Sequence, residues 1–202
     1  MVGYKQISLK DMVEQLGEDK VKDILFDFLC PQNLDVEKFI RFKAIEFAKQ
    51  SIAPTHLIFA SYKDEMRLIG YFTLTIKNFF ASKSNLSSNL RKRVAKFGTY
   101  DNDRKGYIIS APLIAQLGKN YKDNLNTLIT GDELLKLACD KVATIQRDIG
   151  GKIVYLECED KLKLTEFYSS NGFVNFGKRQ LDNDEKDDLS GNYLVQMLKY
   201  LG

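Results

Sequence analysis

The stretch that decides the fold is KLKLTEFYSSNGF, residues 161–173. Apolar and aromatic side chains stand at positions i, i+3 and i+4, so one face of a helix carries Leu164, Phe167 and Tyr168. Asn171 and Gly172 form a helix C-cap signal, and Phe173 begins a strand. Before this helix, the apolar run IVYLEC at 153–158 is typical of a buried strand. The stretch predicts strand, helix and strand in direct succession.

The rest of the chain predicts a mixed sheet surrounded by helices. Helical spacing of apolar residues predicts helices at 8–28 (broken at Gly17), 35–51, 130–147 and 161–170. Runs of apolar, β-branched and aromatic residues predict further strands at 4–8, 56–62, 67–76, 107–117, 172–178 and 192–200. The second and third of these form an antiparallel hairpin, and 107–117 is the central strand. The acidic segment 182–188 is expected to be a solvated loop. This order of elements is α+β or α/β.

Composition and charge exclude several functional classes. The 202 residues are 44% hydrophobic, 28% charged and carry a net charge of +3, which does not force a nucleic-acid function. No apolar run approaches the roughly 18 residues that span a membrane, and the N-terminus has no signal-peptide core, so we expect a cytoplasmic protein. Three cysteines without metal spacing predict reduced buried thiols. A single histidine argues against a Ser–His–Asp triad or a His-rich metal site.

Tyr168 is the first candidate for chemistry. A phenol on the inner face of its helix has a free pKa of about 10. Such a group can give a proton to a departing thiolate, whose own pKa is about 8–9. The alternative is an ordinary core aromatic whose hydroxyl is satisfied by a neighbour.

The start of the helix at 130–147 is the second candidate. Thr130 and Glu133 have the spacing of a capping box, and Gly131 removes a Cβ at the helix start. The unpaired N–H groups and partial positive charge of a helix N-terminus suit a pyrophosphate. The alternative is an ordinary capped connection from strand to helix.

The order of these elements resembles that of the GNAT acetyltransferases. The ending F-Y-x3-G-F at 167–173 reproduces the ending of their tyrosine-bearing helix. Within that superfamily the layout is similar to the toxin acetyltransferases that modify aminoacyl-tRNA, on the segments 69–74, 113–117 and 149–156. The resemblance implies one GNAT domain over 1–202 with a helical N-terminal part at about 1–52. It implies an α/β/α sandwich, with a central mixed sheet splayed at the fourth strand.

The resemblance also implies residues for acetyl-CoA. Tyr168 is carried over as the catalytic acid, and with Phe167 it would border the cofactor. Backbone groups after the central strand would pair with pantetheine, here Leu117, Gly118 and Lys119. The family's phosphate loop, Q/R-x-x-G-x-G/A, falls on Asn126, Ile129, Thr130 and Gly131, followed by Asp132. Asparagine replaces Gln or Arg, and isoleucine stands where the first glycine belongs. Lys119 and Lys122 are candidates to compensate with charge.

A general base would take a proton from the acceptor amine. Glu157 and Glu159 end the strand before the tyrosine helix, and Glu65 is a weaker candidate. The alternative for each is a solvated surface carboxylate. A base is not essential for an α-amino acceptor, whose pKa of about 8 leaves part of it neutral.

The basic run Arg91–Lys96, with Arg104 and Lys105, is the third candidate. It could contact RNA phosphates, and the alternative is a solvated surface. No interleaved aromatic pattern favours an RNA-binding motif.

Together, the residues and the resemblance predict an acetyl-CoA-dependent N-acetyltransferase without a metal. The acceptor amine stays open among aminoacyl-tRNA, a protein amine and a small amine, as does a homodimer. The competing hypothesis is a GNAT-fold binding module that has lost catalysis, motivated by the altered phosphate loop.

Overall fold

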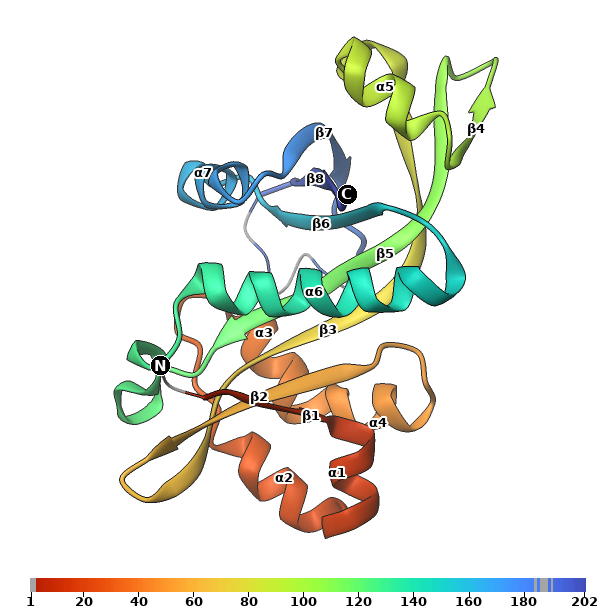
Figure 1. Cartoon of the computed structure of the whole chain (residues 1–202). Coiled ribbons are helices and arrows are strands. Elements are labelled where there is room, and N and C mark those ends of the chain that lie inside the picture. The colour runs from red at the N-terminus through yellow and green to blue at the C-terminus, as the bar shows by residue number, and fades with distance from the viewer. Residues whose placement is uncertain (1–2, 184, 186–188, 190) are drawn as a thin grey trace. The chain divides into compact units, whose positions relative to one another are not determined.

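A computed structural model describes residues 3–183, 185, 189 and 191–202. The chain forms two compact units (Figure 1): a first unit of residues 1–75 and 115–138, and a second of residues 76–114 and 139–202. Strands β3 (Glu65–Ser82) and β5 (Gly106–Lys119) and helix α6 (Gly131–Ile149) each begin in one unit and end in the other. The strands are hydrogen-bonded in the order β1-β2-β3-β5-β6-β8-β7, with β4 paired to β5.

In the first unit, β1 (Lys5–Ser8) and β2 (Thr55–Tyr62) pair antiparallel, and β2 pairs antiparallel with β3. Between β1 and β2 the chain forms α1 (Leu9–Leu16), α2 (Glu18–Phe26), α3 (Leu34–Lys38), a π-helical turn (Phe39–Lys43) and α4 (Ala44–Lys49). Ser8 and Asn33 accept N-cap hydrogen bonds from Asp11 and Val36. Gly17 separates α1 from α2 at a φ of +82°, which favours glycine.

Aromatic side chains pack together within a largely aliphatic core of the first unit. Phe28 meets Tyr71 edge-on with ring centroids 5.2 Å apart, and Phe39 stacks on Tyr71 at 6.4 Å. The Tyr71 hydroxyl is fully buried and donates to the Val36 carbonyl at 2.6 Å. This bond satisfies the one polar atom that the ring brings into the core, and it fixes α3 against β3.

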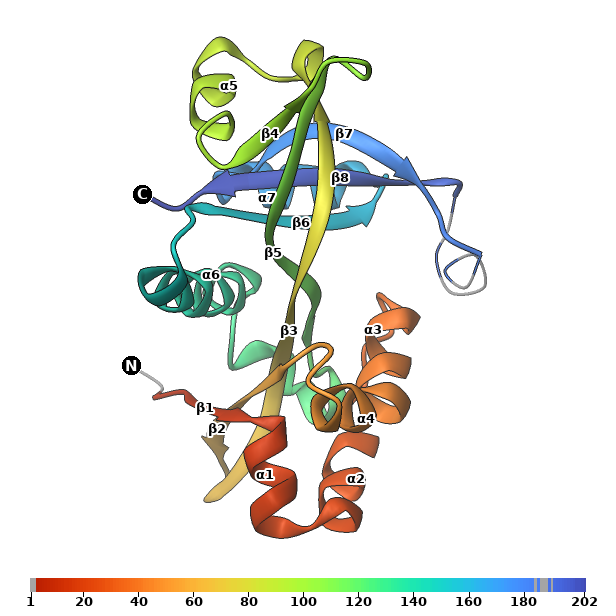
Figure 2. The same ribbon diagram turned by 90° about the vertical axis from the view of Figure 1, so that its right-hand side faces the viewer.

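In the second unit, β5 pairs parallel with β6 (Ile153–Glu159) at Leu113–Tyr155 and Ile114–Leu156. Strand β8 (Tyr193–Tyr200) lies antiparallel between β6 and β7 (Val174–Gln180). Helix α7 (Leu162–Ser170) contacts β6 and β7. Helix α5 (Ser88–Val94) and the antiparallel pair of β4 (Gly98–Asp101) with β5 precede these elements in the chain (Figure 2). The core of this unit includes Phe79 between Tyr155 and Phe176, at 4.5 and 4.7 Å.

These elements confirm the predicted α+β class and its antiparallel hairpin. Strand β4 and the π-helical turn were not predicted, and β3 continues six residues past the predicted end at residue 76. Part of the predicted solvated loop 182–188 lies outside the described residues, and its Glu185 is half-buried in ion pairs rather than solvated. Among the described helices, none is long and apolar enough to cross a membrane.

Candidate functional site

Tyr168 is fixed by the end of α7. The N–H groups of Asn171 and Phe173 both donate to the Tyr168 carbonyl, at 3.1 and 3.0 Å, and the Asn171 side chain donates to the Phe167 carbonyl at 2.9 Å. Gly172 turns the chain at a φ of +82°. The Tyr168 ring lies edge-on to Phe167 at 4.9 Å and to Phe173 at 6.0 Å. The Tyr168 ring is therefore packed against a residue before it in the chain, Phe167, and one after it, Phe173.

The Tyr168 hydroxyl is a potential hydrogen-bond donor to a ligand. The residue is partly buried, and its hydroxyl forms no hydrogen bond with any described residue. Desolvation raises the pKa of this phenol above its usual value of 10.0, and the nearby Cys158 acts in the same direction. The phenol is therefore protonated at neutral pH and has its proton available for a ligand.

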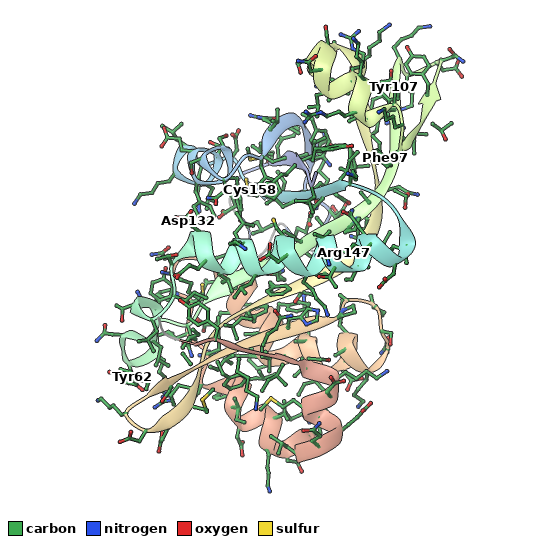
Figure 3. The ribbon with its side chains drawn as sticks, in the orientation of Figure 1. Tyr62, Phe97, Tyr107, Asp132, Arg147 and Cys158 are labelled. Carbon is green, nitrogen blue, oxygen red and sulfur yellow. The ribbon has the colours of Figure 1, made fainter. Side chains whose placement is uncertain are left out.

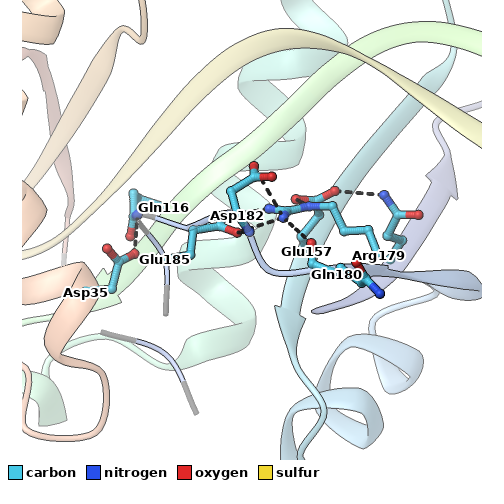
Figure 4. Close-up of polar contacts among 8 residues, drawn as sticks. Asp35, Gln116, Glu157, Arg179, Gln180, Asp182 and Glu185 are labelled. Carbon is cyan, nitrogen blue, oxygen red and sulfur yellow. Dashed lines mark hydrogen bonds and ion pairs between the residues drawn. The ribbon is translucent and has the colours of Figure 1, made fainter. Parts of the chain in front are cut away.

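Glu157 is already committed to two partners (Figure 4). Its Oε2 accepts from Arg179 Nε at 2.7 Å, and its Oε1 accepts from the Gln196 side chain at 2.8 Å. Only 14% of its side chain is exposed. A proton acceptor needs a free lone pair aimed at the substrate, so this geometry favours a positioning role over that of a base.

Glu159 is buried, with 7% of the residue exposed, and its Oε2 lies 2.8 Å from Lys161 Nζ. The interpretation of Glu157 and Glu159 as solvated carboxylates was therefore wrong. Alternating side chains along β6 place these two acids on the same face of that strand. Glu65 is exposed in the first unit and lies 3.9 Å from Arg67, at the β2–β3 turn.

Arg179 connects Glu157 to the chain that follows β7. Its guanidinium bonds Glu157 and also Glu185, at 2.7 and 2.6 Å to the two Glu185 oxygens. Glu185 Oε2 in turn accepts from the Asp182 N–H at 2.8 Å. Arg179 was not among the residues predicted from the sequence. The available signal was an arginine in a strand followed by a carboxylate-rich segment, a pattern too common to single it out.

The end of β5 holds the residues predicted for pantetheine. Gly118 is buried, and a Cβ there would come within 2.3 Å of Val36 Cγ1, so only glycine fits. Leu117 and Lys119 are partly buried. Gln116 donates to Asp35 at 2.7 Å, which ties this end of β5 to α3 (Figure 4).

Asn120 secures the turn after β5 and was not predicted. Its side chain accepts from the N–H groups of Leu29 and Lys122, both at 3.0 Å, and donates to the Leu68 carbonyl at 2.9 Å. It is 3% exposed. A buried asparagine with three bonds orders the exit from β5 and thereby the path to α6.

The start of α6 confirms the predicted capping box. Glu133 N–H donates to Thr130 Oγ1 at 3.1 Å, and the Glu133 carboxylate accepts from Thr130 N–H at 2.8 Å. These bonds lower the pKa of Glu133, so its carboxylate is charged at neutral pH. Asp132 is exposed in the same first turn (Figure 3).

The loop before α6 departs from a phosphate-binding loop in its side chains. Ile129 is 1% exposed and belongs to the core. The Asn126 carbonyl accepts from Lys119 Nζ at 3.0 Å, which brings this cation to the loop. Lys122 instead pairs with Asp27 at 2.6 Å. The Gly131 N–H has no partner among the described residues and is available to an anion.

The structure thus groups the predicted residues by unit. The first unit holds Leu117, Gly118, Lys119, Asn126, Ile129, Thr130, Gly131 and Asp132. The second holds Glu157, Glu159, Phe167 and Tyr168. For a pyrophosphate, the first unit offers the Gly131 N–H and Lys119, opposed by the charges of Asp132 and Glu133. This donor set fits an anion through one cation and backbone groups, without the usual glycines.

Comparison with known proteins places the fold. No family model and no curated protein sequence matches the chain. A solved bacterial toxin is 18% identical with a TM-score of 0.62, covering 100% of this chain and 92% of its own. AtaT complexed with acetyl-methionyl-tRNAfMet is 16% identical at a TM-score of 0.62, and the match covers 96% of this chain and 94% of the AtaT chain.

The fold is that of the GNAT acetyltransferases. A tyrosine-to-phenylalanine mutant of the toxin KacT supports this, with a TM-score of 0.60, 14% identity and 96% and 94% coverage. The resemblance inferred from FYSSNGF is thereby confirmed at the level of the GNAT fold.

Proposed function

We propose that this chain is an acetyl-CoA-dependent N-acetyltransferase that acts by direct attack of an amine on the thioester. The observation that carries the proposal is the protonated Tyr168 hydroxyl, which bonds no residue of the described chain, on the F-Y-x3-G-F helix of a GNAT fold. Solved structures with this fold include AtaTR bound with acetyl-CoA, at 16% identity and a TM-score of 0.54. These likenesses support the choice of acetyl-CoA as the donor substrate.

In the proposed reaction, the acceptor nitrogen forms a bond to the acetyl carbon and the carbon–sulfur bond breaks. Tyr168 gives its proton to the departing thiolate, and the acceptor nitrogen releases a proton to solvent. The raised pKa of Tyr168 keeps the phenol protonated, and therefore in its donor form, at neutral pH. Backbone groups at Leu117, Gly118 and Lys119 would hold the pantetheine arm, and an N–H there would polarise the thioester carbonyl.

The start of α6 would hold the pyrophosphate of acetyl-CoA. Lys119 supplies one positive charge beside Asn126, and Gly131 supplies an N–H without a Cβ in the way. Thr130 and Asp132 border this position, whereas Ile129 supports it from the core. Because two carboxylates oppose the phosphates, we expect acetyl-CoA to bind less tightly than to a glycine-rich loop.

As acceptor we propose the α-amine of an aminoacyl-tRNA. An α-amine has a pKa of about 8 and needs little help from a base, which agrees with the engagement of Glu157 and Glu159 in ion pairs. The likeness to AtaT, solved with acetyl-methionyl-tRNAfMet, also favours this acceptor over small amines.

The proposal is tested by transfer of labelled acetyl from acetyl-CoA. Total aminoacyl-tRNA, deacylated tRNA, a protein mixture and a panel of small amines serve as acceptors. Label on aminoacyl-tRNA that is lost on deacylation supports the proposed acceptor. Label on small amines or proteins alone would exclude it and keep the acetyltransferase. Absence of transfer to every acceptor would reject both.

A second candidate is a GNAT-fold binding module without catalysis. Buried Ile129 and the two carboxylates in the first turn of α6 favour it, because both weaken a phosphate site. Calorimetric titration with acetyl-CoA separates the two candidates. Saturable binding favours the enzyme, and no measurable heat at millimolar ligand favours the module.

A further inference from the structure

The second unit contains a solvent-open hollow of about 480 Å³ that the proposed chemistry does not use. It lies where β3 ends, beside α5 and the β4–β5 hairpin. Three cations, two hydroxyls and one phenol line it: Lys83, Arg91, Lys105, Ser82, Ser84 and Tyr100. Figures 1 and 2 show α5 and β4 together at one end of this unit. The lining residues are therefore contributed by three elements that are separate in sequence.

The hollow is a built feature, because backbone contacts fix its walls. The Lys83 N–H donates to the Lys105 carbonyl at 3.0 Å, which joins the end of β3 to the hairpin turn. A Cβ on Gly106 would come within 2.6 Å of the Ala81 carbonyl oxygen, so glycine permits the close approach of the two strands. Ser87 caps α5 through the Leu90 N–H at 3.3 Å.

The three cations of the hollow have no carboxylate partner among the described residues. Arg91 Nε is also buried without any hydrogen-bond partner in the described chain. Neighbouring arginines are accommodated differently: Arg93 lies over the Tyr200 ring at 4.9 Å, and Arg104 lies over the Phe80 ring at 3.9 Å. A buried guanidinium N–H without an acceptor is costly, and the same arginine lines the hollow, where its guanidinium can meet an anion.

Positive charge is concentrated around this hollow. Residues 82–107 contain seven Lys and Arg and two Asp, a net charge of +5, whereas the whole chain carries +3. The Asp101 carboxylate accepts from the N–H groups of Asp103 and Arg104 and so caps the hairpin turn. The charge extends well beyond one phosphate along exposed Lys92 and Lys96 of the α5 segment. A partner with many phosphates matches this distribution better than a free phosphate ion.

We propose that Lys83, Arg91 and Lys105 bind a backbone phosphate of an RNA. Arg91 would donate to a phosphate oxygen from its guanidinium, and the two lysines would neutralise the same or the adjacent phosphate. Tyr100 adds a hydroxyl donor, whereas Ser82 and Ser84 hydrogen-bond each other and Ser84 donates to Asn85. The choice of RNA over other polyanions rests on the proposed tRNA acceptor. Binding at this hollow requires neither acetyl-CoA nor transfer.

The test compares two triple variants of equal charge. The hollow variant is Lys83→Gln, Arg91→Gln, Lys105→Gln. The control is Lys10→Gln, Lys20→Gln, Arg147→Gln, which removes three exposed cations from α1, α2 and α6 (Figure 3 labels Arg147). Fluorescence anisotropy measures binding of deacylated tRNA to the full-length chain at 50–300 mM salt. Thermal unfolding of both variants confirms that they fold.

We expect the hollow variant to bind tRNA at least about 10-fold more weakly than the control at low salt. Its slope of log K against log salt should be smaller in magnitude by about two to three, since each phosphate contact contributes about 0.7–0.9. Equal tRNA affinity of the two triple variants would overturn the proposal. The proposal would also be overturned if the hollow variant lost binding only to inorganic phosphate, or only to vesicles of phosphatidylserine and phosphatidylcholine, and kept its binding to tRNA. The assay measures tRNA binding and no acetyl transfer. Its result can therefore be interpreted even if the proposed enzyme activity is absent.

Discussion

Arg179 Nε lies 2.7 Å from Oε2 of Glu157, and the same guanidinium bonds both carboxylate oxygens of Glu185. One arginine therefore connects β6, β7 and the chain after β7. The side chains of Glu157 and Arg179 are 14% and 25% exposed, so the pair is shielded from water. Burial of this kind makes the loss of one partner costly, because the other charge is left behind.

Glu157→Gln should lower the unfolding free energy by about 2 kcal/mol, less than the roughly 3–5 kcal/mol of a fully buried pair, because Arg179 keeps Glu185. If Glu157 is a positioning residue, the variant lowers kcat without moving the pH profile. Denaturant unfolding and a pH–rate series measure the two effects. Glu166→Gln, on the exposed face of α7, is the matched control. Loss of the acidic limb of the profile in Glu157→Gln alone would show instead that Glu157 is the base.

The first turn of α6 should tune acetyl-CoA affinity. Asp132→Asn removes a negative charge from the proposed pyrophosphate position and should tighten binding about 2–5-fold, the size of a helix-terminus effect. Lys119→Met should weaken binding. Asp148→Asn, in the last turn of the same helix, should change nothing. Calorimetry gives the three dissociation constants, and a tighter Lys119→Met variant would place the phosphates elsewhere.

Asn120 should contribute to stability through hydrogen bonds that only an amide can make. Asn120→Asp keeps both acceptor positions but cannot donate to the Leu68 carbonyl, and it buries a charge at a site that is 3% exposed. We expect a loss of about 2–3 kcal/mol in unfolding free energy. Asn102→Asp, exposed in the β4–β5 turn, should be neutral. Equal stability of the two variants would contradict the role of Asn120.

Cys158 should make the protein less stable in alkali. Burial, followed by Asp160 and Glu159, raises the pKa of this thiol from 9.0 to about 12. A raised pKa in the folded state means that the contribution is complete below pH 9 and is lost as pH rises toward 12. The difference in unfolding free energy between wild type and Cys158→Ala should therefore shrink between pH 8 and pH 10 by about 1 kcal/mol. A difference that is constant with pH would contradict this assignment.

The sequence carries the local part of this fold well. Helix and strand periodicity predicted the order of most elements but missed α5 and β4. Thr130 with Glu133 predicted their own reciprocal bonds, because these depend on neighbours in the chain. FYSSNGF predicted the α7 ending for the same reason.

Contacts between residues far apart in the sequence could not be predicted from local periodicity. Arg179 meets Glu157 across 22 positions and Asn120 meets Leu68 across 52, and no periodicity records such distances. The burial of Glu159 and Ile129 also depends on tertiary packing. The basic run 91–96 was visible in the sequence, but the hollow that distinguishes Arg91 from Arg93 requires Lys83 and Lys105 from other elements.

Single-turnover acetyl transfer by Tyr168→Phe tests the central claim most directly. Because the hydroxyl bonds no described residue, the variant should keep the wild-type unfolding temperature and acetyl-CoA affinity. Loss of the acid should slow transfer about 10²–10⁴-fold, whereas Tyr193→Phe, exposed on β8, should be unaffected. Transfer at the wild-type rate by a folded Tyr168→Phe protein that binds acetyl-CoA would contradict the assignment of Tyr168 as the catalytic acid.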